Sequence, residues 1–469
     1  MCLSRAPYAP YAPYAPQQFP LPKFPASTFS VHMYKWCALR YISLTALTYV
    51  QPRGVDVRVT LTSEAGSRML TSVIYQNVTG TTTLLDLPVS IQNGQCLQRN
   101  EPNQGVTRIR SADCPKKPYP NVEPKGLKRR KLLHGIPPAE REYHENLRAL
   151  IYESLEEIRS AIGPRKWLFP RQPVKSPVES HAHVREEAKG EETSSGPPII
   201  LSSISNIFTS MEEIAGRIVS NPSSLCTSLV ADSDLYRVPP RSTFILSGVE
   251  QLCPGTRAST NRIFPRDFDL IVMDPPWQNR SVRHAKAYRT SQARREDPFL
   301  SVLPILHSHL RPDGLVGIWV TNKASIRRLV LHSLREKGLQ LYEEWVWMKT
   351  TVDGESVTPL DGLWRRPYEV LLLFRKGPDH KFDVAAGSQW AGSSTWATGV
   401  HRRLLVAVPG HHSQKPCLKE LIEPLLVDPN KYDALEIFAR NLTAGWFACG
   451  NEVLKFNHQS HWARTNEYW

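Results

Sequence analysis

The sequence predicts an α/β protein whose sheet is covered by helices on both faces. Between about residues 234 and 456, apolar runs of strand length recur at 242–246, 268–273, 315–320, 341–348, 369–374, 404–408 and 434–438. Segments with helical patterning separate several of them, at 298–310, 325–337 and 418–426. Continuous apolar strands that alternate with helices are typical of a largely parallel sheet with both faces buried.

The N-terminal region carries weaker signals. Residues 6–14 repeat Ala-Pro-Tyr three times, a composition that favours an extended, unpacked segment. Short β-branched runs at 57–62 and 81–89 lie within residues 40–95, and we expect them to be strands of a small accessory unit. The sequence assigns this region no function.

A basic run and a helix follow. Residues 125–131 hold five positive charges in seven positions, which indicates a nuclear-import signal or a phosphate-contacting patch, with a solvated surface run as the alternative. The helix begins at Pro137-Pro138 and ends at Gly163-Pro164. Its apolar residues recur at three- and four-residue intervals and predict a packing face: Leu147, Leu150, Ile151, Leu155, Ile158 and Ile162.

These patterns divide the chain into four parts. Residues 1–120 form a poorly defined, partly disordered region, and residues 121–230 form a partly helical accessory region. The latter contains a Pro-, Glu- and Ser-rich linker at 170–198 and a second short helix at about 204–218. The α/β domain spans 231–457, and 458–469 is a tail.

Composition restricts the function classes. Lys and Arg outnumber Asp and Glu by 58 to 44, a net charge of +14 that favours a polyanionic partner such as nucleic acid. The eight cysteines lie far apart without a Cys-x-x-Cys pair, so we expect neither a metal site nor a disulfide framework. The most apolar N-terminal stretch, 29–50, is interrupted by His32, Lys35 and Arg40, so we expect no membrane insertion.

One tetrapeptide carries chemistry. Asp274-Pro275-Pro276-Trp277 follows a predicted buried strand, where ligands bind in such sheets. The prolines stiffen the turn, so the Asp274 carboxylate and the Pro275 carbonyl can accept both N–H hydrogens of an aromatic amine and direct its nitrogen at an electrophilic methyl group. Trp277 would offer a flat face to the base, and Asp274 or a water would take the proton. A structural turn after a strand is the alternative.

Four ordered motifs give a family resemblance. They are Asp274–Trp277 with its strand, Trp319-Val-Thr-Asn322, His412-Ser-Gln-Lys-Pro416, and the block from Phe438 through Trp446 to Lys455. Over about residues 230–457 the chain resembles the MT-A seventy (MT-A70) family of adenine-N6 methyltransferases, and is most similar to its methyltransferase-like four branch. The resemblance implies a Rossmann-like sheet with permuted motif order and S-adenosylmethionine as cofactor.

The resemblance also implies roles for individual residues. The catalytic residues would be Asp274, Pro275, Pro276 and Trp277. The cofactor would be held by Ser247, Gly248, Val249, Asp274, Lys415, Arg440, Asn441, Asn451 and Glu452. The substrate would be held by Trp277, Asn279, Arg283, Tyr288, Lys349 and Glu369, and the loops at 278–292 and 408–416 correspond to gates over the pocket. Lys415 and Arg440 as plain surface charges, and Asn451 as a turn cap, are the alternatives.

One residue departs from the family pattern. Gly248 stands where the family usually carries an acid that contacts the cofactor's adenine amine. Either Glu250 replaces that contact or the affinity for the cofactor falls.

The sequence leaves the substrate open. The branch implies RNA, in particular 2′-O-methylated adenosine of spliceosomal small nuclear RNA, with DNA adenine as the rival. Residues 283–289 interleave basic side chains with Tyr288, as a nucleic-acid-tracking loop would, although a solvated loop fits as well. A catalytically inactive nucleic-acid-binding partner and a methyltransferase of protein glutamine or small amines are further alternatives. We expect a nuclear and also cytosolic protein that is monomeric, unlike the heterodimeric members of the family.

Overall fold

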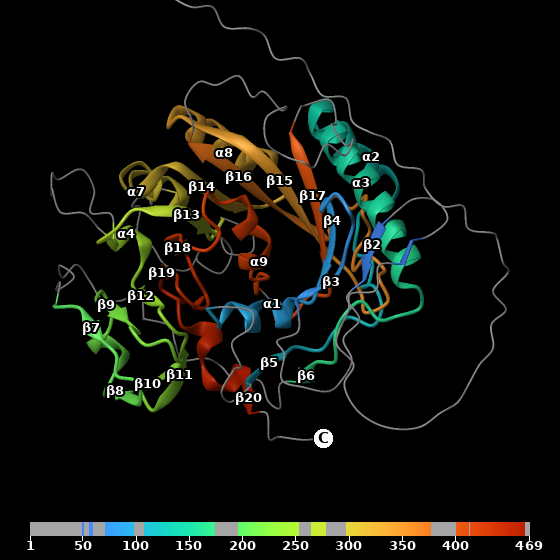
Figure 1. The fold of residues 1–469 in the computed structure, drawn as a ribbon. Coiled ribbons are helices and arrows are strands. Elements are labelled where there is room, and N and C mark those ends of the chain that lie inside the picture. The colour runs from blue at the N-terminus through green and yellow to red at the C-terminus, as the bar shows by residue number, and fades with distance from the viewer. Residues whose placement is uncertain are drawn as a thin grey trace, which may run out of the picture. The chain divides into compact units, whose positions relative to one another are not determined.

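A computed structural model describes residues 49–50, 56–59, 71–97, 107–173, 196–252, 264–277, 297–376, 400–411 and 413–464. Within these ranges, fourteen strands form one sheet (Figure 1). In their order across the sheet they are β1 (Tyr49–Val50), β2 (Asp56–Val59), β3 (Val73–Gln76), β4 (Thr82–Leu85), β17 (His401–Ala407), β15 (Leu339–Lys349), β16 (Tyr368–Lys376), β14 (Leu310–Val320), β13 (Phe268–Met273), β18 (Ala434–Ile437), β19 (Phe447–Gly450), β12 (Thr243–Leu246), β9 (Ile218–Ser220) and β7 (Ile199–Ile200).

The centre of the sheet is mainly parallel. β13 pairs in parallel with β14 and β18, and β19 pairs in parallel with β18 and β12. β16 is antiparallel to β14 and β15, so its first residues lie at the carboxyl ends of its neighbours. The seven strands predicted from apolar runs are all present, and the α/β class is confirmed.

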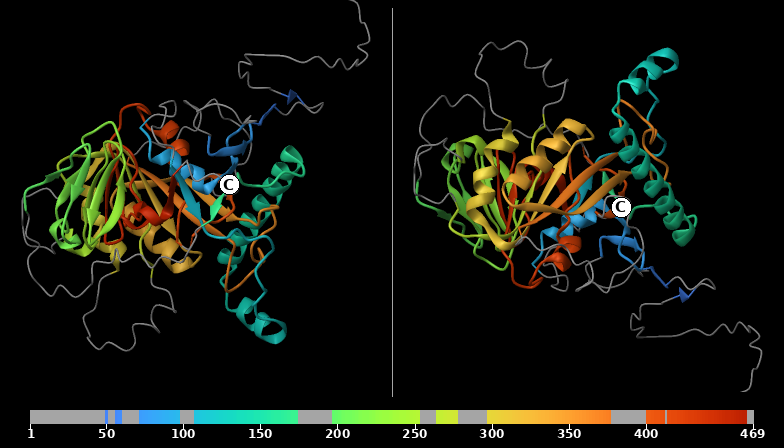
Figure 2. Two further views of the ribbon diagram at one scale, coloured as in Figure 1. Left: turned by 90° about the horizontal axis from the view of Figure 1, so that it is seen from below. Right: turned by 90° about the horizontal axis from the view of Figure 1, so that it is seen from above.

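Side chains alternate between two cores because successive residues of a strand point to opposite faces. In β13, Ile271 and Met273 lie in one core, and Leu270 and Val272 lie in the other. The first core is covered by α3 (Pro138–Ile162), α6 (Pro298–Ser301), α7 (Leu303–His309) and α8 (Ala324–Glu336). The second is covered by α1 (Leu87–Gly94) and by α9 (Lys419–Ile422) with the 3-10 turn Glu423–Leu425 (Figure 2).

The helix predicted after the basic run is α3, and its predicted apolar stripe is buried. Five of the stripe residues join the first core: Leu147, Ile151, Leu155, Ile158 and Ile162. α3 contacts β2, β4 and β17 (Figure 1). The basic run forms most of α2 (Gly126–His134), which has no buried residue.

The prediction of a separate accessory unit at residues 40–95 is wrong. β4 pairs in parallel with β17 through Leu404↔Thr82 and Val406↔Leu84, so β3 and β4 extend the main sheet. β5 (Thr107–Ser111) lies between β6 (Gln172–Pro173) and β20 (Trp462–Arg464) in a small second sheet. N-terminal strands therefore pair with strands from the C-terminal part of the chain in both sheets.

The prediction of a short helix at 204–218 is also wrong. This stretch contains β8 (Ser205–Ile207), a 3-10 turn at Met211–Glu213 and the start of β9. β8 pairs with β10 (Thr227–Ala231), which pairs with β11 (Asp234–Val238). β-Branched residues and the Asn206 side-chain bonds to Ser202 and Ser228 favour the extended form.

No helix in the described ranges is long and apolar enough to cross a membrane.

Candidate active site

The tetrapeptide leaves the carboxyl end of β13 as a tightly held turn. The Trp277 backbone N–H donates to the Pro275 carbonyl at 2.8 Å, and the Trp277 indole N–H donates to the Trp319 carbonyl of β14 at 2.8 Å. The Trp277 ring is 8% exposed and packs on Phe299 with ring centroids 5.6 Å apart. In this arrangement Trp277 anchors the turn to the core instead of presenting an open face to a base.

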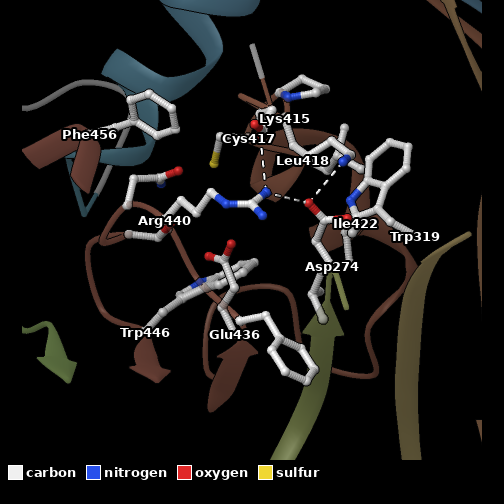
Figure 3. Close-up of a pocket in the computed structure, with 16 residues that line it drawn as sticks. Asp274, Trp319, Lys415, Cys417, Leu418, Ile422, Glu436, Arg440, Trp446 and Phe456 are labelled. Carbon is white, nitrogen blue, oxygen red and sulfur yellow. Dashed lines mark hydrogen bonds and ion pairs between the residues drawn. The ribbon is translucent and has the colours of Figure 1, made fainter. Parts of the chain in front are cut away.

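Two cations bind the carboxylate of Asp274. Lys415 Nζ lies 2.8 Å from Asp274 Oδ2, and Arg440 Nη1 lies 2.9 Å from the same oxygen (Figure 3). Within the described residues no donor contacts Oδ1 of Asp274. A carboxylate oxygen has two lone pairs and so can accept further bonds. One oxygen of Asp274 is therefore paired with two cations, and the other keeps its capacity to accept a hydrogen bond.

Asp274 is the middle of an alternating row of charges along this edge of the sheet. From Lys349 at the end of β15, the row runs through Glu369 of β16, Lys415, Asp274 and Arg440 to Glu452 and Lys455. The Lys415–Glu369 distance is 3.1 Å, Arg440–Glu452 is 2.9 Å and Glu452–Lys455 is 2.8 Å. Each anion is thus held between two cations, which fixes the geometry of long side chains in a region open to solvent on one side.

The charges in the row stabilise one another. Burial opposes the charge of Lys415, but Glu369 and Asp274 outweigh burial and raise the pKa of the ammonium group. Burial likewise opposes the charge of Glu369, yet Lys415 and Lys349 lower the pKa of its carboxyl to about 2. Both groups therefore stay charged at neutral pH.

Glu436 of β18 is a site residue that sequence reasoning missed. Its carboxyl points into the cavity beneath Arg440 (Figure 3). Burial, with a contribution from Asp274, raises the pKa of Glu436 to about 8, against the opposing effect of Arg440. The signal in the sequence was an acid inside an otherwise apolar strand, Ala434-Leu-Glu-Ile437.

Aromatic and apolar side chains complete the cavity around Asp274. Trp319, Trp446 and Phe456 form its walls, and Cys417, Leu418 and Ile422 lie between them (Figure 3). Two cavity residues, Ser413 and Phe438, have left-handed backbone with φ of 64° and 59°. Non-glycine residues rarely adopt this conformation, and such strain concentrates at functional sites.

The structure brings some predicted cofactor residues together and separates others. Asp274, Lys415, Arg440 and Asn441 line the cavity. Ser247, Gly248 and Val249 follow β12, where the Ser247 N–H donates to the Gly450 carbonyl at 3.3 Å, and Asn451 and Glu452 follow β19. These five lie at the same edge of the sheet, but they are not among the residues that line the cavity.

The predicted substrate residues divide in a similar way. Lys349 and Glu369 form an ion pair next to Lys415, on the side of the charge row away from Arg440. Asn279, Arg283 and Tyr288 lie outside the described residues, as do His412 and the whole of the predicted gate at 278–292.

Fold and site together define an α/β enzyme with a Rossmann-like methyltransferase sheet. The chain belongs to the MT-A70 family, whose model matches residues 268–452. It is 31% identical to the N6-methyladenosine RNA methyltransferase MTA1 of Pyricularia oryzae over 416 residues, 84% of this chain and 97% of that protein. The family resemblance and the enzyme class that it implies, an adenine-N6 methyltransferase, are thereby confirmed.

Two further relatives are named for other substrates or for adenine in general. The chain is 35% identical to human N(6)-adenine-specific methyltransferase METTL4 over 248 residues, 52% of this chain and 48% of that protein. It is 27% identical to a DNA N6-methyl methyltransferase of Caenorhabditis elegans over 227 residues, 47% of this chain and 54% of that protein. The relatives thus include enzymes named for RNA and for DNA.

Proposed function

We propose that this protein transfers a methyl group from S-adenosylmethionine to the N6 amine of adenosine in RNA. The observation that carries the proposal is the geometry of Asp274, which lines the cavity and whose Oδ2 is held by Lys415 and Arg440, while no donor among the described residues contacts its Oδ1. A relative of nearly the same extent, matched over 97% of its length, is named an RNA methyltransferase. The net charge of +14 suits a polyanionic substrate.

The residues of the cavity fit such a cofactor. The methionine end of S-adenosylmethionine carries a carboxylate, an ammonium and a sulfonium group. Lys415 would hold the carboxylate, and the acidic oxygens of Asp274 would favour the nearby positive charges. Trp446 and Phe456 offer apolar walls, and Arg440 and Asn441 follow β18, where the family holds the ribose and the adenine edge.

In the proposed reaction this chain mainly positions the reactants. When bound, the cofactor supplies an electrophilic methyl group. Oδ1 of Asp274 and the second lone pair of the Pro275 carbonyl accept the two N–H hydrogens of the amine, which holds the nitrogen in line with that methyl group. As the N–C bond forms and the methyl–sulfur bond breaks, one amine proton passes to Asp274 or to water. The ion pairs with Lys415 and Arg440 hold the Asp274 carboxylate in place before that step.

A paired assay tests the substrate. Purified protein is given matched single-stranded RNA and DNA oligonucleotides with labelled S-adenosylmethionine, and we expect the larger kcat/KM on RNA. Greater efficiency on DNA would reverse the order of the two substrates.

We further propose 2′-O-methylated adenosine of spliceosomal small nuclear RNA as the cellular target and the nucleus as the site of action. Nucleoside mass spectrometry of RNA from cells with and without the protein tests the target, and imaging of a fluorescent fusion tests the location.

Calorimetry separates the enzyme from an inactive partner protein. We expect S-adenosylmethionine to bind, with an affinity reduced by Gly248 if Glu250 does not replace the acid, so that Gly248→Asp tightens binding. An absence of both binding and methyl transfer would favour the reading of an inactive nucleic-acid-binding partner.

A further inference from the structure

The loop between β15 and β16 joins the charge row to an exposed tryptophan. Its flanking residues, Lys349 and Glu369, are both members of the row. Trp364, near the end of the loop, is 53% exposed. An indole ring that stays half exposed offers a large flat apolar face, and covering such a ring is strongly favourable.

The loop is held in a fixed conformation by a buried carboxylate. Glu123 is 9% exposed and accepts the backbone N–H groups of Leu363 at 2.6 Å, Trp364 at 3.1 Å and Arg365 at 3.0 Å. Three successive N–H groups that converge on one anion form a rigid nest. Trp364 is therefore presented by a fixed backbone, which lowers the entropy cost of binding something on its ring.

The basic helix α2 contacts the same loop. Lys128 Nζ lies 4.8 Å from the centre of the Trp364 ring, a cation–π contact, and Arg129 Nη2 bonds Asp361 Oδ2 at 2.6 Å. Because α2 buries none of its residues, these contacts and its connection to α3 are what fix its place. Because α2 has no apolar face, packing against the hydrophobic core does not account for its amino-acid sequence.

The positive charge on this surface is largely unbalanced. Among the described residues, Arg129 is the one basic side chain of the run that pairs with a carboxylate. Lys125, Lys128, Arg130 and Lys131 are exposed, and so is Arg365 beside Trp364. Lys125 and Lys131 are three residues from Lys128 and so share its side of α2. We call Lys125, Lys128, Lys131, Arg365 and Trp364 the α2 platform.

We propose that the α2 platform binds the single-stranded RNA that flanks the target adenosine, with a base stacked on Trp364 and phosphates on the basic side chains. Aromatic rings interleaved with cations are the surface that single strands bind without strong sequence preference. The inference rests on the proposed function for the identity of the substrate. The β15–β16 loop links the platform to the active site, because its flanking residues Lys349 and Glu369 are connected to Asp274 by ion pairs through Lys415.

An import signal alone explains less of the structure. A transport receptor needs an accessible basic run, but it gives no reason for the exposed Trp364, for Lys128 above its ring or for the nest that fixes the loop. A stacking surface accounts for all three.

Fluorescence anisotropy with a labelled single-stranded RNA and the full-length protein tests the platform. Trp364→Ala should weaken binding roughly 5- to 150-fold, the range found for loss of one base stack, and Trp364→Phe should recover much of the loss. The triple variant K125A/K128A/K131A should lower the slope of log affinity against log salt by about 2, since each phosphate contact to a single strand contributes about 0.7. Arg129 is left in place because it holds the helix.

Matched controls remove the same groups elsewhere. R328A/R335A/K337A deletes three exposed cations, two from α8 and one from the residue that follows it, and Tyr152→Ala deletes a ring that is 56% exposed on α3. Both should keep the wild-type affinity and salt slope. Unchanged melting temperature and affinity for S-adenosylmethionine in the platform variants would show that they are folded.

The outcomes distinguish this inference from the proposed function. Wild-type RNA affinity in both Trp364→Ala and the triple variant would overturn the platform, and a simultaneous loss of nuclear accumulation would assign the run to import. Wild-type protein that binds RNA through the platform but transfers no methyl group would contradict the proposed function alone.

Discussion

Substitution of Asp274 should separate methyl transfer from RNA binding. Its Oδ2 pairs with both Lys415 and Arg440, and in the proposed reaction its Oδ1 accepts an amine hydrogen. Asp274→Ala should abolish methyl transfer because it removes the acceptor, whereas RNA affinity should change little because the platform lies elsewhere. Single-turnover assays and anisotropy measure the two quantities. Retained transfer by this variant would refute the assigned role.

Glu436 should make the stability of the protein depend on pH. Its pKa is raised from the ordinary 4.5 to about 8 by burial and by Asp274, so the folded state keeps a proton that the unfolded state loses. Stability from this group is complete below about pH 4.5 and is lost as pH rises towards 8. Glu436→Gln, which stays neutral, should melt progressively higher than wild type between pH 5 and pH 8.5 without cofactor. Glu336→Gln, at an exposed position of α8, should show no such trend. A difference between Glu436→Gln and wild type that does not change with pH would contradict a protonated Glu436.

At the scale of elements, the nest around Glu123 should control the β15–β16 loop. Glu123→Ala leaves three backbone N–H groups without their acceptor, and bonds to a charged acceptor contribute about 1.5–3 kcal/mol each. We expect hydrogen exchange in residues 359–366 to accelerate at least tenfold and KM for RNA to rise, with the affinity for S-adenosylmethionine unchanged. The matched variant is Glu142→Ala, an exposed acid of α3. Unaltered exchange in the loop would show that Glu123 does not hold it.

Elements were predictable from the sequence where local pattern and tertiary role agree. The strands and helices around Asp274 have long apolar runs or clear helical spacing, and the structure contains them, although β14 already begins at Leu310 and the helix predicted at 418–426 is limited to α9 and a 3-10 turn. The stretch at 204–218 was assigned a helix, but it forms strands because pairing with β10 and side-chain bonds from Asn206 override its spacing. The charge row could be predicted only in part, because Lys349, Glu369 and Lys415 come from three segments that only the folded sheet brings together.

At the scale of the whole molecule, the N-terminal segment is part of the catalytic sheet. Residues 71–97 add β3 and β4 beside β17, and α1 packs beneath the cavity, where the Gly94 carbonyl accepts the Ala444 N–H at 2.7 Å. Gln95 donates to the Leu442 carbonyl at 2.7 Å and receives the Asn457 amide at 3.3 Å. The segment before the α/β domain therefore supports the same backbone that carries Arg440 and Asn441.

Truncation should show this dependence. A chain that begins at residue 71 keeps β3, β4 and α1, whereas a chain that begins at residue 98 exposes the surface that buries Leu84, Leu85, Leu87 and Ile91. Each fully buried side chain of this kind contributes about 1.5–3 kcal/mol, so the four together approach the roughly 5–15 kcal/mol that stabilises a whole domain. We expect the shorter chain to be insoluble or to melt without cooperativity, and the longer one to bind S-adenosylmethionine. A shorter chain that melts cooperatively and binds the cofactor as tightly as the longer one would show that the domain starting at 231, together with α3, is sufficient, and that the N-terminal strands only extend a sheet that is already stable.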